Sequence, residues 1–394
     1  MKTGAAGAHR AEHFRPDIEG LRAVAVMLVA LDHADIGFLA GGYIGVDVFF
    51  VISGFLITSL LLREVGGPSR RRALVNFYAR RVKRLLPAAT LVLFVTVMAA
   101  YHYLGFLRGD DVAIDARWCA AFVGNIRFAL VGTNYLGAQE PPSPLQHFWS
   151  LGVEEQFYLV WPSMMLLVAA VVPRRHLRIS IGILLGIVIS ASLAWSYLQT
   201  NSDPGWAYFS PLTRAWELGV GASIAIGAPL VSRISPRLAI PISWIGLIGI
   251  VASAFIIDGA TPFPGIAAIA PVLATALVIV GGAVGSGGGA VALLRRLPFQ
   301  WVGKLSYSFY LWHWPILVIA AQHAGKRLSV AHNLVLLTGA LALSAVTFYT
   351  VESPVRRSRA LRGKDPIVVV VGLCLVIFTI AVSSWTLSRH AGII

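Results

Sequence analysis

Charged residues are scarce in this chain. Only 13% of its 394 residues are Asp, Glu, Lys or Arg, whereas 57% are hydrophobic, and the mean hydropathy is +0.75. A typical soluble domain has roughly 25% charged residues. The composition therefore excludes an ordinary soluble domain and indicates that most of the chain lies in a bilayer.

Cysteine and acidic residues are also few. The two cysteines, Cys119 and Cys374, lie in apolar stretches without a CxxC motif, so we expect neither a disulfide framework nor a thiolate metal site. We also expect no other bound metal and no permanently bound cofactor. Basic residues outnumber acidic ones by 32 to 18, but they form short clusters between apolar runs. Because such clusters lack the interleaved aromatic residues of an RNA-binding surface, we expect no nucleic-acid partner.

Apolar runs of about twenty residues, the length that a helix needs to cross a membrane, fill the chain instead. Eleven candidate spans can be marked, at residues 22–36, 44–63, 85–104, 148–172, 178–198, 212–229, 239–257, 264–282, 304–323, 331–351 and 367–388. A shorter apolar stretch, 118–131, contains Asn125 and Arg127 and is interpreted as a re-entrant or interfacial segment. The predicted fold is an all-α, polytopic membrane bundle of about ten core helices plus an eleventh, C-terminal helix.

Cationic residues gather in alternate connections between these spans. Clusters occur at residues 70–84, 174–178, 233–237, 295–296 and 356–364, whereas the acidic residues Asp110, Asp111, Asp115, Glu140 and Asp203 fall in the other connections. Cytoplasmic loops of membrane proteins carry an excess of Lys and Arg. We therefore expect a cytoplasmic N-terminal tail at 1–16, a transmembrane domain at 17–357 and an additional helix at 366–388.

The first span carries three ionisable residues, Arg22, Asp32 and His33, and each needs a structural or functional reason because it costs at least ~2.5 kcal/mol to insert. Arg22 and His33 are eleven residues apart, which places them about 16 Å apart along the helix and nearly on one face. His33 could act as a general base toward a hydroxyl or could carry an acyl group. A proton relay or a hydrogen-bonded packing histidine explains this helix equally well.

A cluster of arginines marks the start of the third span. Arg80, Arg81 and Arg84 suit a phosphorylated ligand such as coenzyme A, because guanidinium groups bind phosphates in bidentate fashion. Basic residues at an inner helix end are also expected for orientation and lipid headgroups alone. Both interpretations stay open for this cluster.

Polar residues form stripes on two further spans. They are Ser150, Glu154 and Tyr158, with Glu155 beside them, on span 148–172, and Ser306, Tyr310 and His313 on span 304–323. Residues three or four positions apart share a helix face, and carboxylates entering a membrane need polar surroundings. We expect these stripes to line a cavity. Trp312 and Trp314 would alternatively place the second stripe in an interfacial belt.

Three smaller features are interpreted as structural. Arg214 and Glu217 are spaced for an ion pair, and Glu352 is close enough in sequence to pair with the arginines at 356 and 357. Ser53-Gly54 indicates close helix packing rather than a nucleophile, because no base is identifiable beside the serine.

These motifs, taken in order, resemble the acyltransferase 3 family of bacterial membrane enzymes. The resemblance runs from Phe14 to about Arg357 and includes residues 15–23, His33, 45–55, the arginine cluster up to Pro87, 149–162, 310–315 and 351–354. It implies an enzyme of the bacterial cytoplasmic membrane that moves an acyl group, usually acetyl, from cytoplasmic acyl-coenzyme A to hydroxyls of envelope glycans or glycolipids.

The resemblance also implies roles for individual residues. His33 and Arg22 match the essential residues of the first helix, and Arg80, Arg81 and Arg84 match the arginine motif, to which we assign donor phosphate binding. To these we add Glu154 as a group that orients His33 or binds the acceptor, and Glu155, Tyr158, Tyr310 and His313 as acceptor-binding residues. Membrane lipids and a separate extracytoplasmic transferase complete the expected partners.

The sequence departs from the family pattern in two respects, and two other functions compete with the acyltransferase interpretation. Asp32 precedes His33 where apolar or aromatic residues are usual, and no extracytoplasmic esterase-like domain is expected in this chain. A proton-coupled transporter or flippase would use His33 and Glu154 as a proton relay. A membrane subunit of an envelope-assembly complex would need no chemistry at all.

Overall fold

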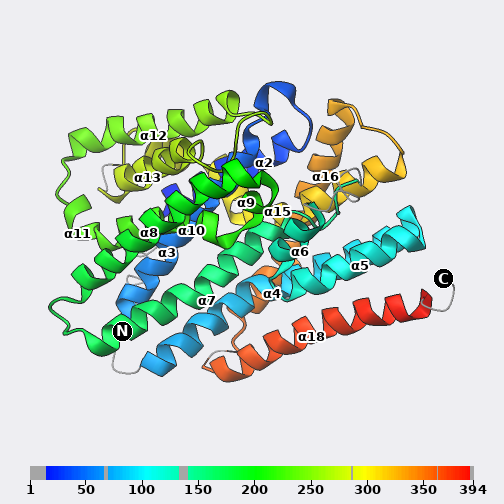
Figure 1. Ribbon diagram of the computed structural model, residues 1–394, viewed down its shortest axis with the longest axis horizontal. Coiled ribbons are helices and arrows are strands. Elements are labelled where there is room, and N and C mark those ends of the chain that lie inside the picture. Colours follow the sequence, from blue (N-terminus) through cyan, green and yellow to red (C-terminus); the bar gives the residue numbers. More distant parts are fainter. Residues whose placement is uncertain (1–14, 66–69, 133–140, 285–286, 362, 391–394) are drawn as a thin grey trace, which may run out of the picture.

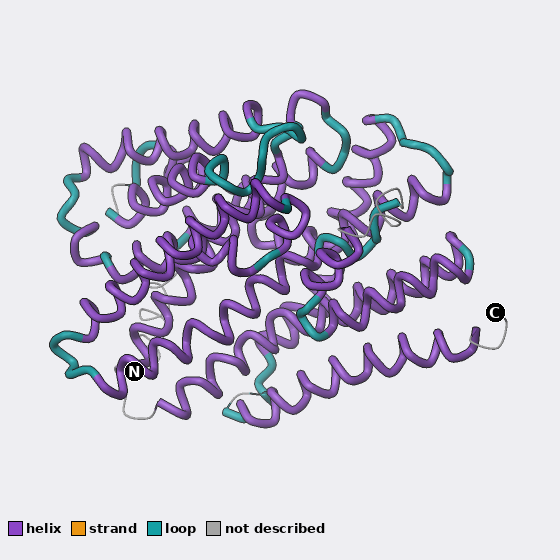
Figure 2. Tube along the Cα trace, viewed as in Figure 1, coloured by secondary structure: helices purple, strands orange, loops and turns teal. Residues whose placement is uncertain are grey.

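The computed structural model describes residues 15–65, 70–132, 141–284, 287–361 and 363–390 (Figure 1). The tail predicted at 1–16 therefore lies outside the described residues as far as residue 14. Throughout the described ranges the chain forms helices joined by loops, with no strand (Figure 2). Six of these helices are long and apolar enough to cross a membrane, and the prediction of an all-α membrane bundle is confirmed.

Each of the eleven predicted spans overlaps at least one helix, and some overlap two. In chain order the elements are α2 (Pro16–Asp32), η1 (Gly37–Leu39), η2 (Gly42–Ile44), α3 (Gly45–Val65), α4 (Arg70–Leu104), α5 (Phe106–Ala120), α6 (Gly124–Gly132), α7 (Phe148–Val171), α8 (Leu177–Ser202), α9 (Pro204–Phe209), α10 (Pro211–Ile226), α11 (Ala228–Val231), α12 (Pro236–Ile256), α13 (Ile269–Ala283), α14 (Ala290–Leu294), α15 (Leu297–His323), α16 (Val330–Thr347), the π-helical turn η3 (Phe348–Glu352), α17 (Ser353–Arg357) and α18 (Asp365–His390).

Several elements differ from the predicted spans. α2 runs from Pro16 to Asp32 rather than over 22–36, α13 begins at Ile269 rather than 264, and α15 begins at Leu297 rather than 304. α4 begins at Arg70, fifteen residues before the predicted start at 85, so the arginine cluster lies within a helix rather than in a connection. The apolar stretch 118–131 is divided between α5 and α6, and the chain turns at Phe122, whose φ of 56° is in the left-handed region. Whether this stretch is re-entrant stays a prediction, as does the cytoplasmic N-terminus.

The first helix, α2, is buried within the bundle and packs against both α3 and α15. Leu21, Ala25 and Ala30 are fully buried. A Cβ on Gly303 of α15 would lie 1.9 Å from the carbonyl oxygen of Glu19, so the close approach of these two helices requires glycine. α2 therefore holds its ionisable side chains at fixed positions in the interior.

α3 is fixed against α10 by glycines on both helices. A Cβ on Gly54 would lie 1.8 Å from the carbonyl oxygen of Leu218, and one on Gly221 would lie 1.9 Å from that of Val51. Small residues at a membrane helix interface allow such backbone contact. The prediction that Ser53-Gly54 marks close helix packing is confirmed.

Substituting Gly54 by Val is expected to destabilise the protein, because the new side chain must displace the α10 backbone. Overpacking of this kind costs roughly 1–3 kcal/mol or more. Thermal unfolding in detergent would measure the loss. Gly339→Ala is the matched control, since a Cβ there meets no atom within 4 Å, and equal unfolding temperatures for the two variants would contradict the prediction.

The C-terminal helix α18 lies along one edge of the bundle, beside α4 and α5 (Figure 1). Gly372 of α18 approaches Val82 of α4, where a Cβ would lie 2.7 Å from a methyl carbon of the valine. Much of α18 remains exposed on the side away from α4, including Ile367, Leu373 and Ile377. This is the pattern of a helix that packs on one side against protein and on the other against lipid.

Candidate active site

His33 lies at the end of α2, where it meets His313 of α15. Its Nδ1 is 3.0 Å from Nε2 of His313, and the two rings are parallel to within 4°. The ring of Trp314 lies beside His33, with 4.3 Å between the ring centroids. The sequence predicted both histidines as site residues, but it gave no signal that they would contact each other.

The hydrogen bonds of His313 determine which nitrogen of His33 is free to act. Nδ1 of His313 lies 2.7 Å from the carbonyl oxygen of Tyr310 and 3.2 Å from that of Phe309, so this nitrogen carries the proton. In a neutral imidazole the other nitrogen is then an acceptor. His33 therefore donates its Nδ1–H to His313, and the lone pair of the ring is on Nε2.

His33 opens onto the largest of the cavities described here, which we call the histidine cavity. It has a volume of about 870 Å³ and is lined by both aromatic and polar side chains. The lining includes Asp32, His33, Tyr103, Arg108, Trp314, Gln322, His323, Lys326, Arg327 and Asn333. Aromatic rings beside hydrogen-bonding groups form a surface on which a sugar can stack and bond. Asp32, the departure noted above, lies in this lining.

A third histidine, His147, lies close to this pair and was missed from the sequence. Its ring centroid is 5.8 Å from that of His313, and its Nε2 lies 3.2 Å from the carbonyl oxygen of Leu311. Its Nδ1 is buried without a hydrogen-bond partner among the described residues. The only signal in the sequence was its position directly before the polar stripe of α7.

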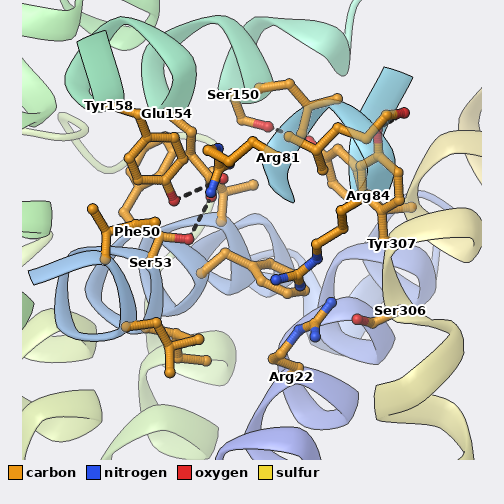
Figure 3. A pocket seen from close by; sticks show the side chains of 18 residues that line it. Arg22, Phe50, Ser53, Arg81, Arg84, Ser150, Glu154, Tyr158, Ser306 and Tyr307 are labelled. Carbon is orange, nitrogen blue, oxygen red and sulfur yellow. Dashed lines mark hydrogen bonds between the residues drawn. The ribbon is translucent and has the colours of Figure 1, made fainter. Parts of the chain in front are cut away.

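A second, narrower cavity, the arginine pocket, has a volume of about 90 Å³ and is lined by Arg22, Arg81, Arg84, Ser53, Glu154, Tyr158, Ser306 and Tyr310, among others (Figure 3). Glu154 accepts hydrogen bonds from Ser53 Oγ at 3.0 Å and from the Tyr158 hydroxyl at 3.3 Å. The statement that no base lies beside Ser53 was therefore wrong. The carboxylate comes from α7, 101 residues further along the chain, a distance at which sequence spacing gives no information.

Glu155, which was assigned to the acceptor, lies against Arg81 instead. Its carboxylate is 2.5 Å from the Arg81 guanidinium, whose central carbon also lies 3.7 Å from the centre of the Tyr158 ring. The charge of Arg81 is thus already compensated within the protein. Arg81 and Glu155 hold α4 and α7 together at the wall of the pocket.

Arg22 and Arg84 differ from Arg81 in this respect. Their guanidinium groups point toward one another across the pocket (Figure 3). Arg22 has a carboxylate only at 4.0 Å, that of Glu19, and within the described ranges no carboxylate pairs with Arg84. Two facing guanidinium groups repel unless an anion lies between them. Arg80, the third predicted phosphate ligand, is exposed and lies outside the lining of this pocket.

A third cavity, which we call the basic cavity, adjoins the arginine pocket. Its volume is about 510 Å³, and it shares Arg22, Arg84 and Leu56 with the pocket. Its lining is Arg15, Ile18, Glu19, Arg22, Leu56, Arg84, Gln300, Lys304, Glu352, Arg356 and Arg357. Arg22 and His33, both on α2, thus line cavities at opposite ends of the same helix.

Tyr310 lies between the arginine pocket and the histidines. It lines the pocket. Its hydroxyl lies 2.8 Å from Ser150 Oγ and donates a hydrogen bond to the carbonyl oxygen of His147 at 2.9 Å. Its own carbonyl oxygen accepts a hydrogen bond from Nδ1 of His313. A group that moves from the arginine pocket to His33 would pass this side chain.

The predicted pair of Arg214 and Glu217 is confirmed, and the structure adds a second acid. Nη1 of Arg214 lies 2.9 Å from Glu217 and 2.8 Å from Asp47 of α3, and all three side chains are buried. The rings of Trp149, Tyr208 and Phe263 surround the guanidinium group. The sequence analysis did not single out Asp47, although a carboxylate among apolar residues is the kind of group that needs a partner.

The predicted pair at the end of α16 is also present, although it is loose. Glu352 lies 3.8 Å from Nη1 of Arg356 and accepts a hydrogen bond from Ser308 Oγ at 3.0 Å. Arg356 is 41% exposed, so this contact contributes little to stability.

Comparison with known proteins identifies relatives along most of the chain. A family described as "Acyltransferase domain" matches residues 15–351. A "Putative peptidoglycan O-acetyltransferase" of Bacillus subtilis is 31% identical over 363 residues, which cover 88% of this chain and 56% of the relative. A "Peptidoglycan O-acetyltransferase" of Listeria monocytogenes is 28% identical over 87% of this chain and 56% of its own length. The chain thus spans little more than half the length of these relatives, and no solved structure matches it.

Proposed function

This chain belongs to the acyltransferase 3 family, and from that premise we propose that it transfers an acyl group, most simply acetyl, from acyl-coenzyme A to hydroxyls of a cell-envelope glycan or glycolipid. One observation carries the proposal: a single helix, α2, presents Arg22 to the arginine pocket and His33 to the histidine cavity. The names of the two relatives support peptidoglycan as the acceptor.

The donor would bind from the side of the arginines, which we place in the cytoplasm. Arg22 and Arg84 would hold its phosphates, because their guanidinium groups face each other (Figure 3) and, among the described residues, the only carboxylate paired with either is that of Glu19, 4.0 Å from Arg22. The narrow arginine pocket suits the thin pantetheine arm, and its polar wall of Ser53, Glu154 and Tyr158 offers hydrogen bonds to the amides of that arm. Glu155 and Tyr158 would then serve the donor side rather than the acceptor.

The acceptor would enter the histidine cavity, which we place outside the cytoplasm. His33 Nε2 would take the proton of an acceptor hydroxyl while the oxygen attacks the thioester carbonyl. The carbon–sulfur bond then breaks, and the thiolate of coenzyme A leaves with the proton that His33 gained. Alternatively His33 Nε2 attacks the thioester first and takes the acyl group as the carbon–sulfur bond breaks; the acceptor hydroxyl then takes the acyl group from the imidazole and gives up its proton to the coenzyme A thiolate. The mass of protein incubated with acetyl-coenzyme A alone, with or without an added acetyl group, distinguishes the two routes.

Envelope analysis tests the proposal as a whole. Mass spectrometry of peptidoglycan and glycolipids from cells with the protein, without it and with His33→Ala should show ester-linked acetyl groups only in the first. Unchanged acetylation in all three would contradict the proposal. A proton-driven flux of an envelope precursor without coenzyme A would favour a transporter instead. Outer acetylation that needs a second, separate protein would identify the expected extracytoplasmic partner.

His313 is expected to act as a positioning residue for His33. His313→Gln keeps an oxygen that can accept the His33 Nδ1–H, whereas His313→Leu cannot, so turnover should fall about tenfold to a hundredfold further in the Leu variant. The KM for acetyl-coenzyme A should stay unchanged in both. His332→Leu, at an exposed histidine of α16, is the control. Equal turnover in the Gln and Leu variants would show that His313 acts only through packing.

A further inference from the structure

The basic cavity carries more positive charge than its own carboxylates compensate. Six cationic side chains and two carboxylates, Glu19 and Glu352, line it. Two of the cations, Arg22 and Arg84, belong to the wall shared with the arginine pocket. Lys304, Arg356 and Arg357 lie beyond that wall and line the basic cavity without reaching the pocket. They form a second group of cations that the proposed mechanism does not use.

The local fold brings these three cations together. Helix α16 continues into the π-helical turn η3 (Phe348–Glu352) shortly before Pro354. The regular α-helical hydrogen bonds cannot continue there because proline has no N–H. The turn leads into α17, which carries Arg356 and Arg357 and packs against α4. Lys304 of α15 and Arg356 of α17 both lie near the aromatic ring of Phe348. Nζ of Lys304 is 5.1 Å from the ring centre, and the guanidinium carbon of Arg356 is 5.8 Å from it.

The charge of this group is only partly balanced. Glu352 faces Arg356 at 3.8 Å, and its other oxygen accepts from Ser308. The shared ring of Phe348 is fully buried and holds two cations at one place, where an aromatic face compensates them only weakly. A polyanion with several phosphate oxygens would compensate all three cations at once.

The two groups of cations match the two positions of phosphate in coenzyme A. Its pyrophosphate adjoins the pantetheine arm, and its remaining phosphate is on the 3′-oxygen of the ribose at the far end. If the arm occupies the arginine pocket, the pyrophosphate meets Arg22 and Arg84 at the shared wall. We infer that Lys304, Arg356 and Arg357 form the subsite for the 3′-phosphate, an inference that rests on the proposed function.

Such a subsite would give the enzyme a way to select its donor. A 3′-phosphate distinguishes acyl-coenzyme A from its dephosphorylated form and from nucleotides without that group. Gln300, which also lines the cavity, donates its amide hydrogens to the carbonyl oxygens of Pro16 and Leu294. This residue therefore connects α2 and α15 at the cavity wall. The charged contacts with a bound 3′-phosphate would come from the three cations.

Binding affinity tests the inference without relying on turnover. The full chain, purified in nanodiscs of neutral lipid at low salt, would be titrated with acetyl-coenzyme A and with 3′-dephospho-acetyl-coenzyme A. We expect the wild type to bind the first about tenfold or more tightly, as charge-assisted phosphate contacts require. Lys304→Gln and Arg357→Gln should each lower the affinity for acetyl-coenzyme A toward the affinity for the dephosphorylated form. The affinity for the dephosphorylated form itself should stay unchanged. Arg359→Gln is the control, because Arg359 is exposed and does not line the cavity.

Four other outcomes would overturn the inference. Equal affinity of the wild type for the two nucleotides would show that there is no 3′-phosphate subsite. If the variants lose affinity for both nucleotides equally, these residues have only a structural or general electrostatic role. Loss of bound anionic phospholipid from the variants, with nucleotide affinities unchanged, would assign the cations to lipid headgroups. If neither nucleotide binds the wild type, the proposed function fails as well, which separates that result from the others.

Discussion

Replacement of His33 with Ala is expected to lower the release of coenzyme A from acetyl-coenzyme A by about 10²–10⁴-fold, the usual contribution of a positioned general acid–base group. The lone pair on Nε2 is the only one that the hydrogen bond to His313 leaves on the ring. Removing the imidazole removes that lone pair, whichever of the two routes the acyl group follows. A thiol assay on purified protein measures the loss.

The controls separate chemistry from folding and donor binding. His33→Gln can still contact His313 but offers no basic nitrogen, so it should be about as inactive as His33→Ala. Both variants should bind acetyl-coenzyme A with wild-type affinity, because the phosphates would be held at the other end of α2. Wild-type turnover by His33→Ala would remove this histidine from the reaction. Loss of donor affinity in both variants would place the donor differently from our proposal.

The sequence predicted the helices well, because their determinants are local. Every apolar run of membrane length falls on helix, although α4 and α15 begin earlier than predicted, α13 begins later, and the stretch 118–131 is divided near Phe122. Arg22 and His33 could be placed on one helix because eleven residues of a regular helix define a distance. Pairs on a single helix, such as Arg214 with Glu217, followed from the same periodicity.

Contacts between helices could not be predicted, because they depend on packing rather than on spacing. His33 and His313 are 280 residues apart, and Ser53 and Glu154 are 101 residues apart. Two adjacent carboxylates in α7 looked alike in the sequence, yet Glu154 binds Ser53 while Glu155 pairs with Arg81. Which carboxylate meets which partner depends on where α3 and α4 pack beside α7. The position of α3 in turn depends on close contacts such as that of Gly54 with the Leu218 backbone of α10.

Replacement of Arg214 with Met is expected to cause the largest loss of stability. It would leave the carboxylates of Asp47 and Glu217 buried together without a counter-charge, and breaking a buried ion pair costs about 3–5 kcal/mol. The yield of monodisperse protein in size-exclusion chromatography and the unfolding temperature in detergent both measure this effect. Lys83→Gln, which removes a partly exposed pair with Asp365 at 3.8 Å, should change stability by less than about 1 kcal/mol.

Neutralising the acids at the same time should restore much of that stability. In the triple variant Arg214→Met, Asp47→Asn, Glu217→Gln this cluster keeps no charge, and replacing a whole buried ionic group by neutral residues is often close to neutral in stability. Because Asp47 is on α3 and Arg214 on α10, recovery in the triple variant would show that charge balance, rather than the exact contact, holds these two helices together. If the triple variant is as unstable as Arg214→Met alone, the guanidinium group itself, packed among Trp149, Tyr208 and Phe263, is what the interface requires.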